Sequence, residues 1–320
     1  GLSRLDAALI FEQMAAGCTS TTAFITIHNM ATWMVAQFGN ADIQKQIAPN
    51  MASGEWLGSY CLTEPGAGSD AGNLRTKATR DGDSYLLNGS KVFISGAGAT
   101  QMLVVMARTG EPGSGPTGIS AFVVPADSDG IHYGKAEEKM GWNSQPTRQI
   151  TFENVRVPAN NRLGEEGQGF MIAMKGLDGG RLNIATCSMG GAQAALLRAR
   201  NYMHEREQFG QALAGFQALQ FKLADMATNL VAARQMVRLA AYRLDQGDTE
   251  ATLHCAMAKR FATDACFEVV NEALQLHGGY GYMRDSRVEQ LMRDAKILQI
   301  YAGTDEMQVI AIARDLLAHG

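Results

Sequence analysis

The spacing of hydrophobic residues changes twice along this 320-residue chain, and that change limits the folds it can adopt. Apolar residues in 1–55, and again from residue 169 onward, recur about every 3.6 positions, which is typical of amphipathic helices. Between them, residues 57–160 carry short β-rich runs separated by Gly, Asn, Asp and Pro. Because no helical pattern separates these strands, the sequence predicts an α+β protein rather than a Rossmann-like one.

Three structural units are expected in chain order. An N-terminal α-helical domain covers residues 1–56, a middle antiparallel β-domain covers 57–168, and a C-terminal four-helix bundle covers 169–320. A hydrophobic content of 46% is enough for a large core. The chain starts inside a helical pattern and without Met, so we expect the N-terminal domain to be only partly present.

Local signals place individual strands in the middle domain. Asn88-Gly89 between apolar residues predicts a hairpin with a type I′ turn, because both residues tolerate positive φ angles. Further strands are expected at 103–107, 119–124 and 149–157, the last divided by a turn at Glu153-Asn154.

The C-terminal pattern predicts a helix that carries Asp178, followed by a long helix with an apolar stripe from Leu219 to Leu244. Three more helices fit residues 249–277, 286–299 and 305–318.

Composition narrows the partners. The formal net charge is −4, and no run of Lys or Arg is present, which argues against nucleic acid or an anionic membrane as the main partner. No apolar stretch is long enough to span a membrane, and no targeting signal is apparent. The five cysteines form no Cys-x-x-Cys pair, and no His, Cys and carboxylate set has metal-ligand spacing. We therefore expect no metal and a reducing compartment, the cytoplasm of a bacterium or the mitochondrial matrix of a eukaryote.

The clearest loop of the chain is Tyr-Cys-Leu-Thr-Glu-Pro-Gly-Ala-Gly-Ser-Asp at residues 60–70. Its glycines let backbone N–H groups approach a ligand, although composition alone fits a surface turn equally well. The eleven residues resemble the signature of acyl-CoA dehydrogenases, flavoenzymes that remove an α-proton and a β-hydride from a CoA thioester. The resemblance extends over the whole chain. It implies that family's fold, FAD as cofactor, an acyl-CoA substrate, a homotetramer, and electron-transfer flavoprotein as electron acceptor.

The resemblance assigns flavin contacts in the middle domain. In the family this loop lies along FAD, which implies contacts from Tyr60, Leu62, Thr63, Gly68 and Ser69, and Ser69 also touches the CoA part of the substrate.

Phe93-Ile94-Ser95 follows the predicted hairpin. In many family members a similar triplet covers one flavin face and reaches the N5 edge, which implies FAD contacts for Phe93, Ile94 and Ser95. A structural role, a strand end that packs Phe93 into the sheet, is also expected to be compatible with these contacts.

Two segments of the C-terminal domain resemble elements that reach FAD across a subunit interface. Arg206-Glu207-Gln208-Phe209-Gly210 with Gln217 resembles one of them, and Arg206 would face the pyrophosphate. Residues 275–282 resemble the other, a Gly-Gly-x-Gly segment that contacts the adenosine half of FAD. By itself this pattern more often ends a helix. His277 alone is more typical of a packing or capping residue than of a ligand-binding one. The residues thus assigned to FAD, together with two from the start of the last helix, are Arg206, Gln208, Phe209, Gln217, Gln275, Gly278, Gly279, Thr304 and Glu306.

The segment Asp178-Gly179-Gly180-Arg181 is expected within a helix. Two glycines there cost about 1 kcal/mol each relative to Ala, so a close approach of another group should offset them. The family places the acyl chain and pantetheine beside this turn; the alternative is a helix kink with a solvated Arg. The resemblance implies substrate contacts for Ser69, Asp178, Gly179, Gly180, Arg181, Tyr301 and Gly303. Thr304 is also a plausible N-cap of the last helix.

Ala302 is the main departure from the family. Most members carry at this position the glutamate that takes the α-proton, and one subset carries its base where this chain has Gly180. A methyl group cannot accept a proton. The resemblance therefore implies FAD-dependent α,β-dehydrogenation of an acyl-CoA with the catalytic base removed at Ala302, so that turnover is absent or strongly impaired. The alternatives are a non-catalytic flavin- and acyl-CoA-binding homologue, or an enzyme that uses another carboxylate.

Several stretches resemble the branch of the family that oxidises isobutyryl-CoA in valine catabolism. This implies a short branched-chain acyl-CoA substrate. The stretches are residues 1–6, 17–23, 27–30, 89–98, 141–148 and 179–185.

Overall fold

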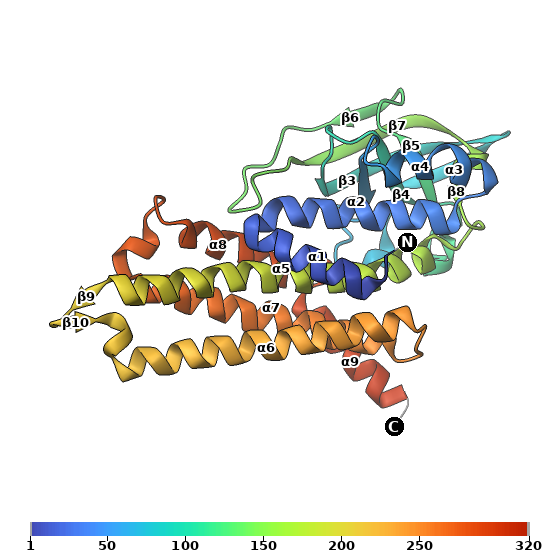
Figure 1. The fold of residues 1–320 in the computed structure, drawn as a ribbon. Helices are drawn as coiled ribbons and strands as arrows, with labels where there is room; N and C mark the ends of the chain where they lie inside the picture. Colours follow the sequence, from blue (N-terminus) through green and yellow to red (C-terminus); the bar gives the residue numbers. More distant parts are fainter. Residues whose placement is uncertain (1, 319–320) are drawn as a thin grey trace. The chain divides into compact units, whose positions relative to one another are not determined.

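The chain forms two compact units in the computed structural model, which describes residues 2–318 (Figure 1). The helical unit combines Gly1–Ala23, Lys139–Asn143 and Asp178–Gly320, and the sheet unit combines Phe24–Glu138 and Ser144–Leu177. Residues 1 and 319–320, at the outer ends of the first and last expected domains, lie outside the described part. The first helix therefore belongs with the C-terminal helices, and the next three helices belong mainly with the sheet.

The sheet unit contains an eight-stranded sheet in the order β6-β7-β3-β2-β4-β5-β8, with β1 paired to β4. Its strands are β1 (Gly58–Cys61), β2 (Lys77–Asp81), β3 (Ser84–Ser95), β4 (Met102–Arg108), β5 (Ile119–Pro125), β6 (Ile131–Tyr133), β7 (Thr147–Pro158) and β8 (Arg162–Leu163). The pairs are antiparallel except for β1 with β4 and the short contact between β2 and β4. The strands expected at 103–107 and 119–124 are present as β4 and β5.

The hairpin expected at Asn88-Gly89 is wrong. The chain reverses at Gly82 and Asp83, between β2 and β3, and β3 continues through both residues. The turn expected at Glu153-Asn154 is also wrong, because β7 is continuous there and the register with β3 slips between Leu87 and Gly89. The side chains of Asn88 and Asn154 hydrogen-bond at 3.1 Å, so these turn-forming residues make a β-bulge inside a long ribbon.

Both faces of β4 are covered, which explains why Met102–Ala107 reads as a continuous apolar run. Met102, Val104 and Met106 join a core with buried residues of α2 (Thr19–Phe38) and with α3 (Ala41–Gln46) and α4 (Ala48–Ala52). Leu103, Val105 and Ala107 face a second core built from β3, β5 and β7. This alternation follows from the two-residue period of a strand.

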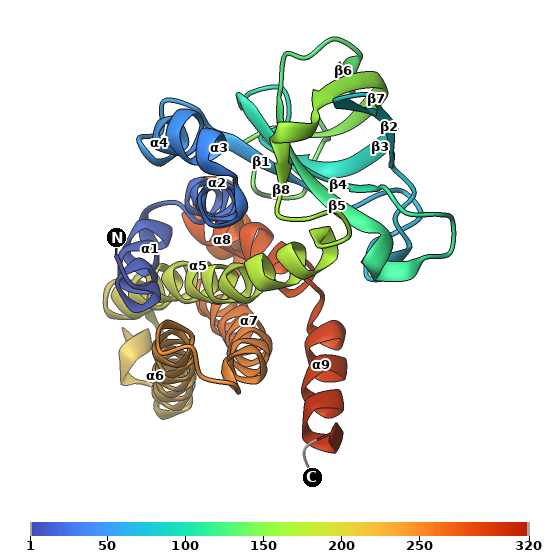
Figure 2. The same cartoon turned by 90° about the vertical axis from the view of Figure 1, so that its right-hand side faces the viewer.

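The helical unit packs α1 (Arg4–Gly17) with α5 (Gly169–Glu205), α6 (Gln217–Asp245), α7 (Ala251–Leu276), α8 (Arg287–Lys296) and α9 (Asp305–Ala318). Figure 2 shows α6 and α7 side by side, seen nearly along their axes. The predicted helices are present, except that the one expected at 286–299 ends at Lys296 and continues as the 3₁₀ turn η6 (Ile297–Gln299). Ser3 begins α1 with a capping box that includes Asp6.

Short elements connect the units' main helices and strands. They are η1 (Ala71–Asn73), η2 (Gly115–Gly118), η3 (Ala159–Asn161), β9 (Glu207–Gln208), β10 (Gln211–Ala212), η4 (Leu213–Gly215) and η5 (Gly278–Tyr282). Among residues 2–318, none of the helices has the length and apolarity that a membrane span requires.

Candidate functional site

The glycine-rich loop after β1 is held from inside by a buried ion pair. Lys91 on β3 is fully buried, and its Nζ donates to Glu64 Oε1 at 2.8 Å and to the Leu62 carbonyl at 3.0 Å. The Glu64 carboxylate also accepts hydrogen bonds from the backbone N–H groups of Arg75 at 2.6 Å and Thr76 at 2.9 Å. Burial raises the pKa of Glu64, but the charge of Lys91 and these hydrogen bonds outweigh it, and the pKa lies below its ordinary value.

The outer side of this loop is open. Gly68 and Ser69 are exposed, and a Cβ built on Gly68 would meet no atom within 4 Å. Tyr60 and Thr63 are half-buried and Leu62 is buried. Of the five expected contacts, Gly68 and Ser69 therefore present their surface most fully to a ligand.

Phe93, Ile94 and Ser95 end β3 in an unusual conformation. Phe93 has a φ of 59° and is 66% exposed, whereas Ile94 and Ser95 are buried. The expected packing of Phe93 into the sheet is therefore wrong. A bulky residue with positive φ is a genuine outlier and tends to occur at binding sites.

A cavity of about 310 Å³ in the sheet unit is lined by several cationic side chains. It is lined by Asn73, Leu74, Arg75, Lys77, Arg108, Gly110, Pro112, Gly113 and Gly115. Arg108 is structural, because its guanidinium donates to the carbonyls of Gly72, Leu74 and Gly115. The side chains of Arg75 and Lys77 are exposed at the cavity. Sequence reasoning missed this cavity, although Arg75, just before β2, and Lys77, the first residue of β2, are cations at alternate positions.

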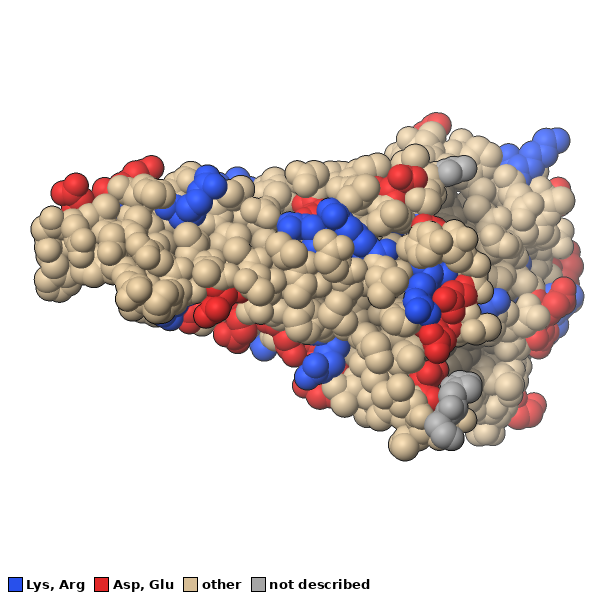
Figure 3. All heavy atoms as spheres, turned by 60° about the horizontal axis from the view of Figure 1, so that its bottom comes forward, with Lys and Arg blue, Asp and Glu red and all other residues tan. Residues whose placement is uncertain are grey.

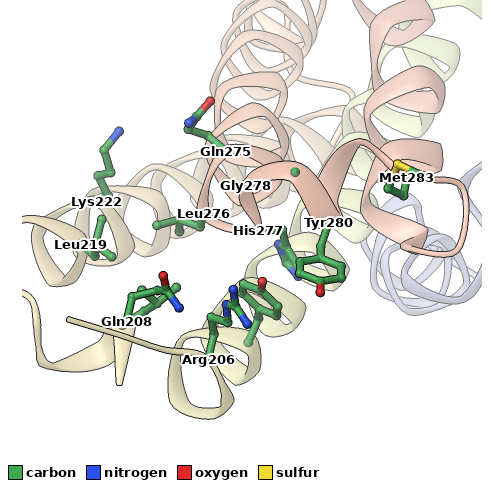
Figure 4. Close-up of a pocket in the computed structure, with 13 residues that line it drawn as sticks. Arg206, Gln208, Leu219, Lys222, Gln275, Leu276, His277, Gly278, Tyr280 and Met283 are labelled. Carbon is green, nitrogen blue, oxygen red and sulfur yellow. The ribbon is translucent and has the colours of Figure 1, made fainter. Parts of the chain in front are cut away.

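A larger cavity of about 800 Å³ lies in the helical unit (Figure 4). Its walls are Tyr202, Arg206, Gln208, Leu213, Leu219, Lys222, Gln275, Leu276, His277, Gly278, Gly279, Tyr280 and Met283. The structure thus brings together Arg206, Gln208, Gln275 and the two glycines, five of the residues expected to bind FAD. Figure 4 shows the Arg206 guanidinium beside Tyr280, and its Cζ is 5.6 Å from the centroid of that ring.

His277 supports this cavity as a packing residue. Its Nδ1 lies 2.7 Å from the Ala273 carbonyl, and its ring stacks on Tyr202 with centroids 4.5 Å apart. Gly278 has a φ of 57°, and a Cβ on Gly278 or Gly279 would meet nothing within 4 Å, so the backbone there is accessible.

Two residues of the segments expected to reach FAD across a subunit interface, Phe209 and Gln217, do not line this cavity. Phe209 is 95% exposed with a φ of 52°, at the tip of the β9–β10 hairpin, and Gln217 is exposed at the start of α6. Their flavin roles stay predictions, and an exposed Phe at a hairpin tip is suited to contact with another chain.

Ala302 lies in a tight turn between η6 and α9. Its φ is 56° and that of Gly303 is 86°, so two consecutive residues adopt the left-handed conformation. Ala302 packs against a buried cluster that contains Trp142 and Ile184. The neighbouring Tyr301 ring is 5.3 Å from the Trp142 ring, a contact that the sequence did not predict.

Thr304 caps α9 as expected, because its Oγ1 accepts a hydrogen bond of 3.3 Å from the Met307 N–H. A hydrogen bond from Thr304 lowers the pKa of the exposed Glu306 carboxyl. The Asp305 side chain, unlike that of Glu306, is buried. It is 9% exposed, and the fully buried Lys259 Nζ donates to its Oδ1 at 2.6 Å.

On α5, Asp178 and Arg181 form a partly buried pair. Arg181 donates to Asp178 Oδ1 at 2.9 Å, and the Thr252 hydroxyl donates to Asp178 Oδ2 at 2.8 Å. Burial raises the pKa of Asp178, and Arg181 opposes that shift. The Arg181 side chain is only 13% exposed, so the alternative of a solvated Arg is wrong. The expected close approach is present at Gly179, where a Cβ would lie 2.8 Å from the guanidinium carbon of Arg4.

Within residues 2–318, no group of three or more His, Cys, Asp and Glu side chains could hold a metal ion. On the face drawn in Figure 3, basic and acidic side chains alternate between wide uncharged stretches.

Known acyl-CoA dehydrogenase domains match nearly the whole chain: the N-terminal domain over residues 1–55, the middle domain over 59–155 and the C-terminal domain over 167–317. The chain belongs to the acyl-CoA dehydrogenase family. It is 53% identical over 317 residues to the mitochondrial isobutyryl-CoA dehydrogenase of Bos taurus, an alignment that covers 99% of this chain and 76% of that protein.

Solved acyl-CoA dehydrogenase structures share the fold. Butyryl-CoA dehydrogenase from Megasphaera elsdenii has a TM-score of 0.95 and 41% identity, covering 99% of this chain and 83% of that one. A chain solved in work on the electron transferring flavoprotein of Acidaminococcus fermentans and electron bifurcation has a TM-score of 0.94, 41% identity, and coverage of 99% and 83%. The reaction class that follows from the family is acyl-CoA dehydrogenation.

FAD is the cofactor typical of acyl-CoA dehydrogenases, and this chain has the groups to hold it. The larger cavity offers the cation Arg206, and it offers open backbone at Gly278 and Gly279. The glycine-rich loop offers open backbone and the Ser69 hydroxyl in the sheet unit. Both sets suit an anionic dinucleotide, whose phosphates need cations and N–H donors.

Proposed function

We propose that this protein is an FAD-dependent acyl-CoA dehydrogenase for short branched thioesters such as isobutyryl-CoA, with turnover limited by Ala302. The observation that carries this is the turn at residues 301–303. Ala302 and Gly303 have positive φ angles, a conformation that tends to occur at functional sites. The side chain of residue 302, the position at which the family carries its base, is only a methyl group. The 53% identity to an isobutyryl-CoA dehydrogenase supports the choice of substrate.

In this proposal the chain keeps the group that polarises the thioester carbonyl but lacks the group that accepts the α-proton. FAD, when bound, supplies the hydride acceptor. The backbone N–H of residue 302 donates to the thioester carbonyl, which makes the neighbouring α-proton more acidic. This donor does not depend on the side chain, so Ala302 still provides it. The acceptor for the α-proton is the missing group, and Gly180 offers none at the family's other position.

The CoA end would be bound by the sheet unit. Ser69 is exposed on the glycine-rich loop, and the following residues lead to the cavity lined by Arg75 and Lys77. CoA carries phosphate groups, and exposed cations at a concave surface are suited to bind them. We assign Arg75 and Lys77 to these phosphates.

We further propose a homotetramer that passes electrons to an electron-transfer flavoprotein, in a bacterial cytoplasm or a mitochondrial matrix. Large apolar side chains are exposed on α6, where Phe221 is 59% and Tyr242 55% exposed, and on α9, where Leu316 is 54% exposed. Such exposed groups favour association with other chains. The chain related to work on electron transferring flavoprotein supports the choice of acceptor.

The competing function is a flavin- and acyl-CoA-binding protein without chemistry, and the absence of a carboxylate at residue 302 favours it. A visible spectrum of the purified protein tests for bound flavin. Anaerobic addition of isobutyryl-CoA then distinguishes the two functions. Slow bleaching of the flavin supports a weakened dehydrogenase, whereas a spectral perturbation without bleaching supports the binding protein. A colourless protein that binds no added FAD would refute both.

A further inference from the structure

The turn that carries Ala302 is fixed at both ends by one buried ammonium group. Lys259 on α7 is fully buried. Its Nζ donates to the Gln299 carbonyl at 3.2 Å, just before the turn, and to Asp305 Oδ1 at 2.6 Å, just after it. The seven residues 299–305 are thus tied to a single point on α7.

Neighbouring side chains on α7 complete this attachment. The Thr263 hydroxyl, one helical turn after Lys259, lies 2.9 and 3.0 Å from the two oxygens of Asp305. Gln299 Nε2 donates to Asp264 Oδ1 at 2.9 Å. The Gln299 end of the turn is therefore bound to α7 through its backbone carbonyl and its side chain, and the Asp305 end through its side chain.

The interior of the turn is held separately. The Gln308 side chain, 1% exposed, donates from Nε2 to the Gly303 carbonyl at 3.0 Å. Residue 302 is left at the apex with a φ of 56°, a conformation that costs energy for any residue with a Cβ. Such a conformation persists only where the surroundings over-determine it, and these bonds do so.

Helix initiation alone does not explain the buried pair. Thr304 already caps α9 with its hydroxyl. Removing charges from water is costly, and a well-packed apolar pair often stabilises as much as a buried ion pair. Burial also lowers the pKa of Lys259 and raises that of Asp305, so both charges are opposed by their surroundings. Unlike an apolar contact, the bonds of Lys259 are directional. They hold the Gln299 carbonyl and the Asp305 carboxylate in fixed positions at the two ends of the turn.

We propose that Lys259 is a positioning residue for the reaction: through Gln299 and Asp305 it sets the direction of the residue-302 backbone N–H toward the thioester carbonyl. This rests on the proposed function, in which that N–H polarises the carbonyl. It predicts that the polarising half of the site stays intact in this chain although Ala302 carries no base. Ala302 and a glutamate at the same position would then present the same N–H.

The test measures carbonyl polarisation directly and needs no turnover. Isobutyryl-CoA labelled with ¹³C at the thioester carbonyl is bound to the FAD-loaded protein without oxygen, and isotope-edited infrared difference spectra report the C=O stretch. In the parent chain the stretch should move to lower wavenumber than in free thioester. In Lys259→Met most of that shift should be lost, while flavin content and FAD affinity stay unchanged.

Lys259→Met leaves Asp305 buried without its partner and can unfold the protein. The double variant Lys259→Met/Asp305→Asn removes both charges, and it should lose the same shift. Arg234→Met is the matched control, because Arg234 on α6 makes a partly buried pair with Glu12 on α1, at 2.7 Å, away from this turn. This control should keep the full carbonyl shift even where its melting temperature falls.

A kinetic readout uses the active background. In Ala302→Glu, adding Lys259→Met should lower kcat about 10²- to 10³-fold, the usual loss for one donor to a reacting carbonyl, with KM changed much less. A folded double variant that keeps the parent's carbonyl shift would overturn the role of Lys259. Loss of the shift in Arg234→Met as well would overturn it too, because the effect would then be general. No shift in the parent itself would instead refute the proposed function.

Discussion

Restoring a carboxylate at residue 302 is the most direct perturbation. Ala302→Glu supplies the missing proton acceptor and leaves the backbone donor in place. The existing φ of 56° is the reason that the change should be tolerated. Ala and Glu are both unbranched at Cβ and bear the same left-handed backbone cost, so no new strain is introduced. Residue 302 is also half-buried rather than enclosed, which leaves room for a longer side chain.

The expected gain follows from general-base catalysis. A positioned base contributes about 10²–10⁴ in rate, which corresponds to a barrier lower by about 2.7–5.4 kcal/mol at 1.36 kcal/mol per tenfold. Partial burial should raise the pKa of the new carboxyl above that of a free Glu. Because only the ionised form accepts a proton, the rate should increase with pH through this single pKa and fall away below it.

The assay is anaerobic stopped-flow bleaching of the flavin by isobutyryl-CoA, with thioester affinity measured in parallel. Ala302→Gln is the matched control, because it has nearly the same shape as Glu without the basic group, and it should bind thioester but remain slow. Equal bleaching rates for the parent, the Gln variant and the Glu variant would refute the reasoning. The base would then be another group, such as Asp178, which is already committed to Arg181 and Thr252.

Four further outcomes are expected. Arg206→Ala should weaken FAD retention about ten- to a hundred-fold, since a charge-assisted pair is worth about 1.5–3 kcal/mol, and should affect acyl-CoA binding less. Flavin fluorescence on dilution measures the FAD retention. Equal loss of both ligands would indicate unfolding instead. Light scattering should give a tetramer, and a monomer that retains stoichiometric FAD would contradict the proposed assembly. Arg75→Ala should weaken isobutyryl-CoA binding but leave the affinity for isobutyryl-pantetheine unchanged, as measured by calorimetry. Glu64→Gln should lower the melting temperature at neutral pH. Because the pKa of Glu64 is depressed in the folded state, its stabilisation is present above the unfolded pKa and is lost as pH falls through the folded pKa, so the two proteins should converge in acid.

Periodicity predicted the helices of this fold because each has a consistently buried face, and continuous apolar runs predicted β4 and β5 because both faces of these strands are buried. It failed at Asn88-Gly89 and Glu153-Asn154, where turn-forming residues serve a bulge between two long strands. Local propensity cannot distinguish these cases, since the deciding partner is more than 60 residues away. At the site, the resemblance identified Arg206, Gln275 and the glycines that the structure places at one cavity.

Other features of the site could not be predicted from the spacing of residues in the sequence. The roles of Lys259 and Asp305 depend on a contact 46 residues apart in the chain. A signal was nevertheless present. Lys259 precedes Thr263 by one helical turn and lies between Cys255 and Cys266 on the buried and mainly apolar stripe of α7, where an unpaired Lys would be costly.

The carboxylate of Glu64 has a consequence for motion. It joins the glycine-rich loop to β3 through Lys91 and to the chain before β2 through Arg75 and Thr76. Local opening of the loop would therefore leave a charged group in a dry interior, so the loop cannot fray independently of its sheet. The amide hydrogens of Arg75 and Thr76, which bond to the Glu64 carboxylate, should exchange with solvent only when the whole sheet unit unfolds. This loop is a rigid platform and not a lid, and a ligand meets its exposed side at Gly68 and Ser69 without the loop itself opening.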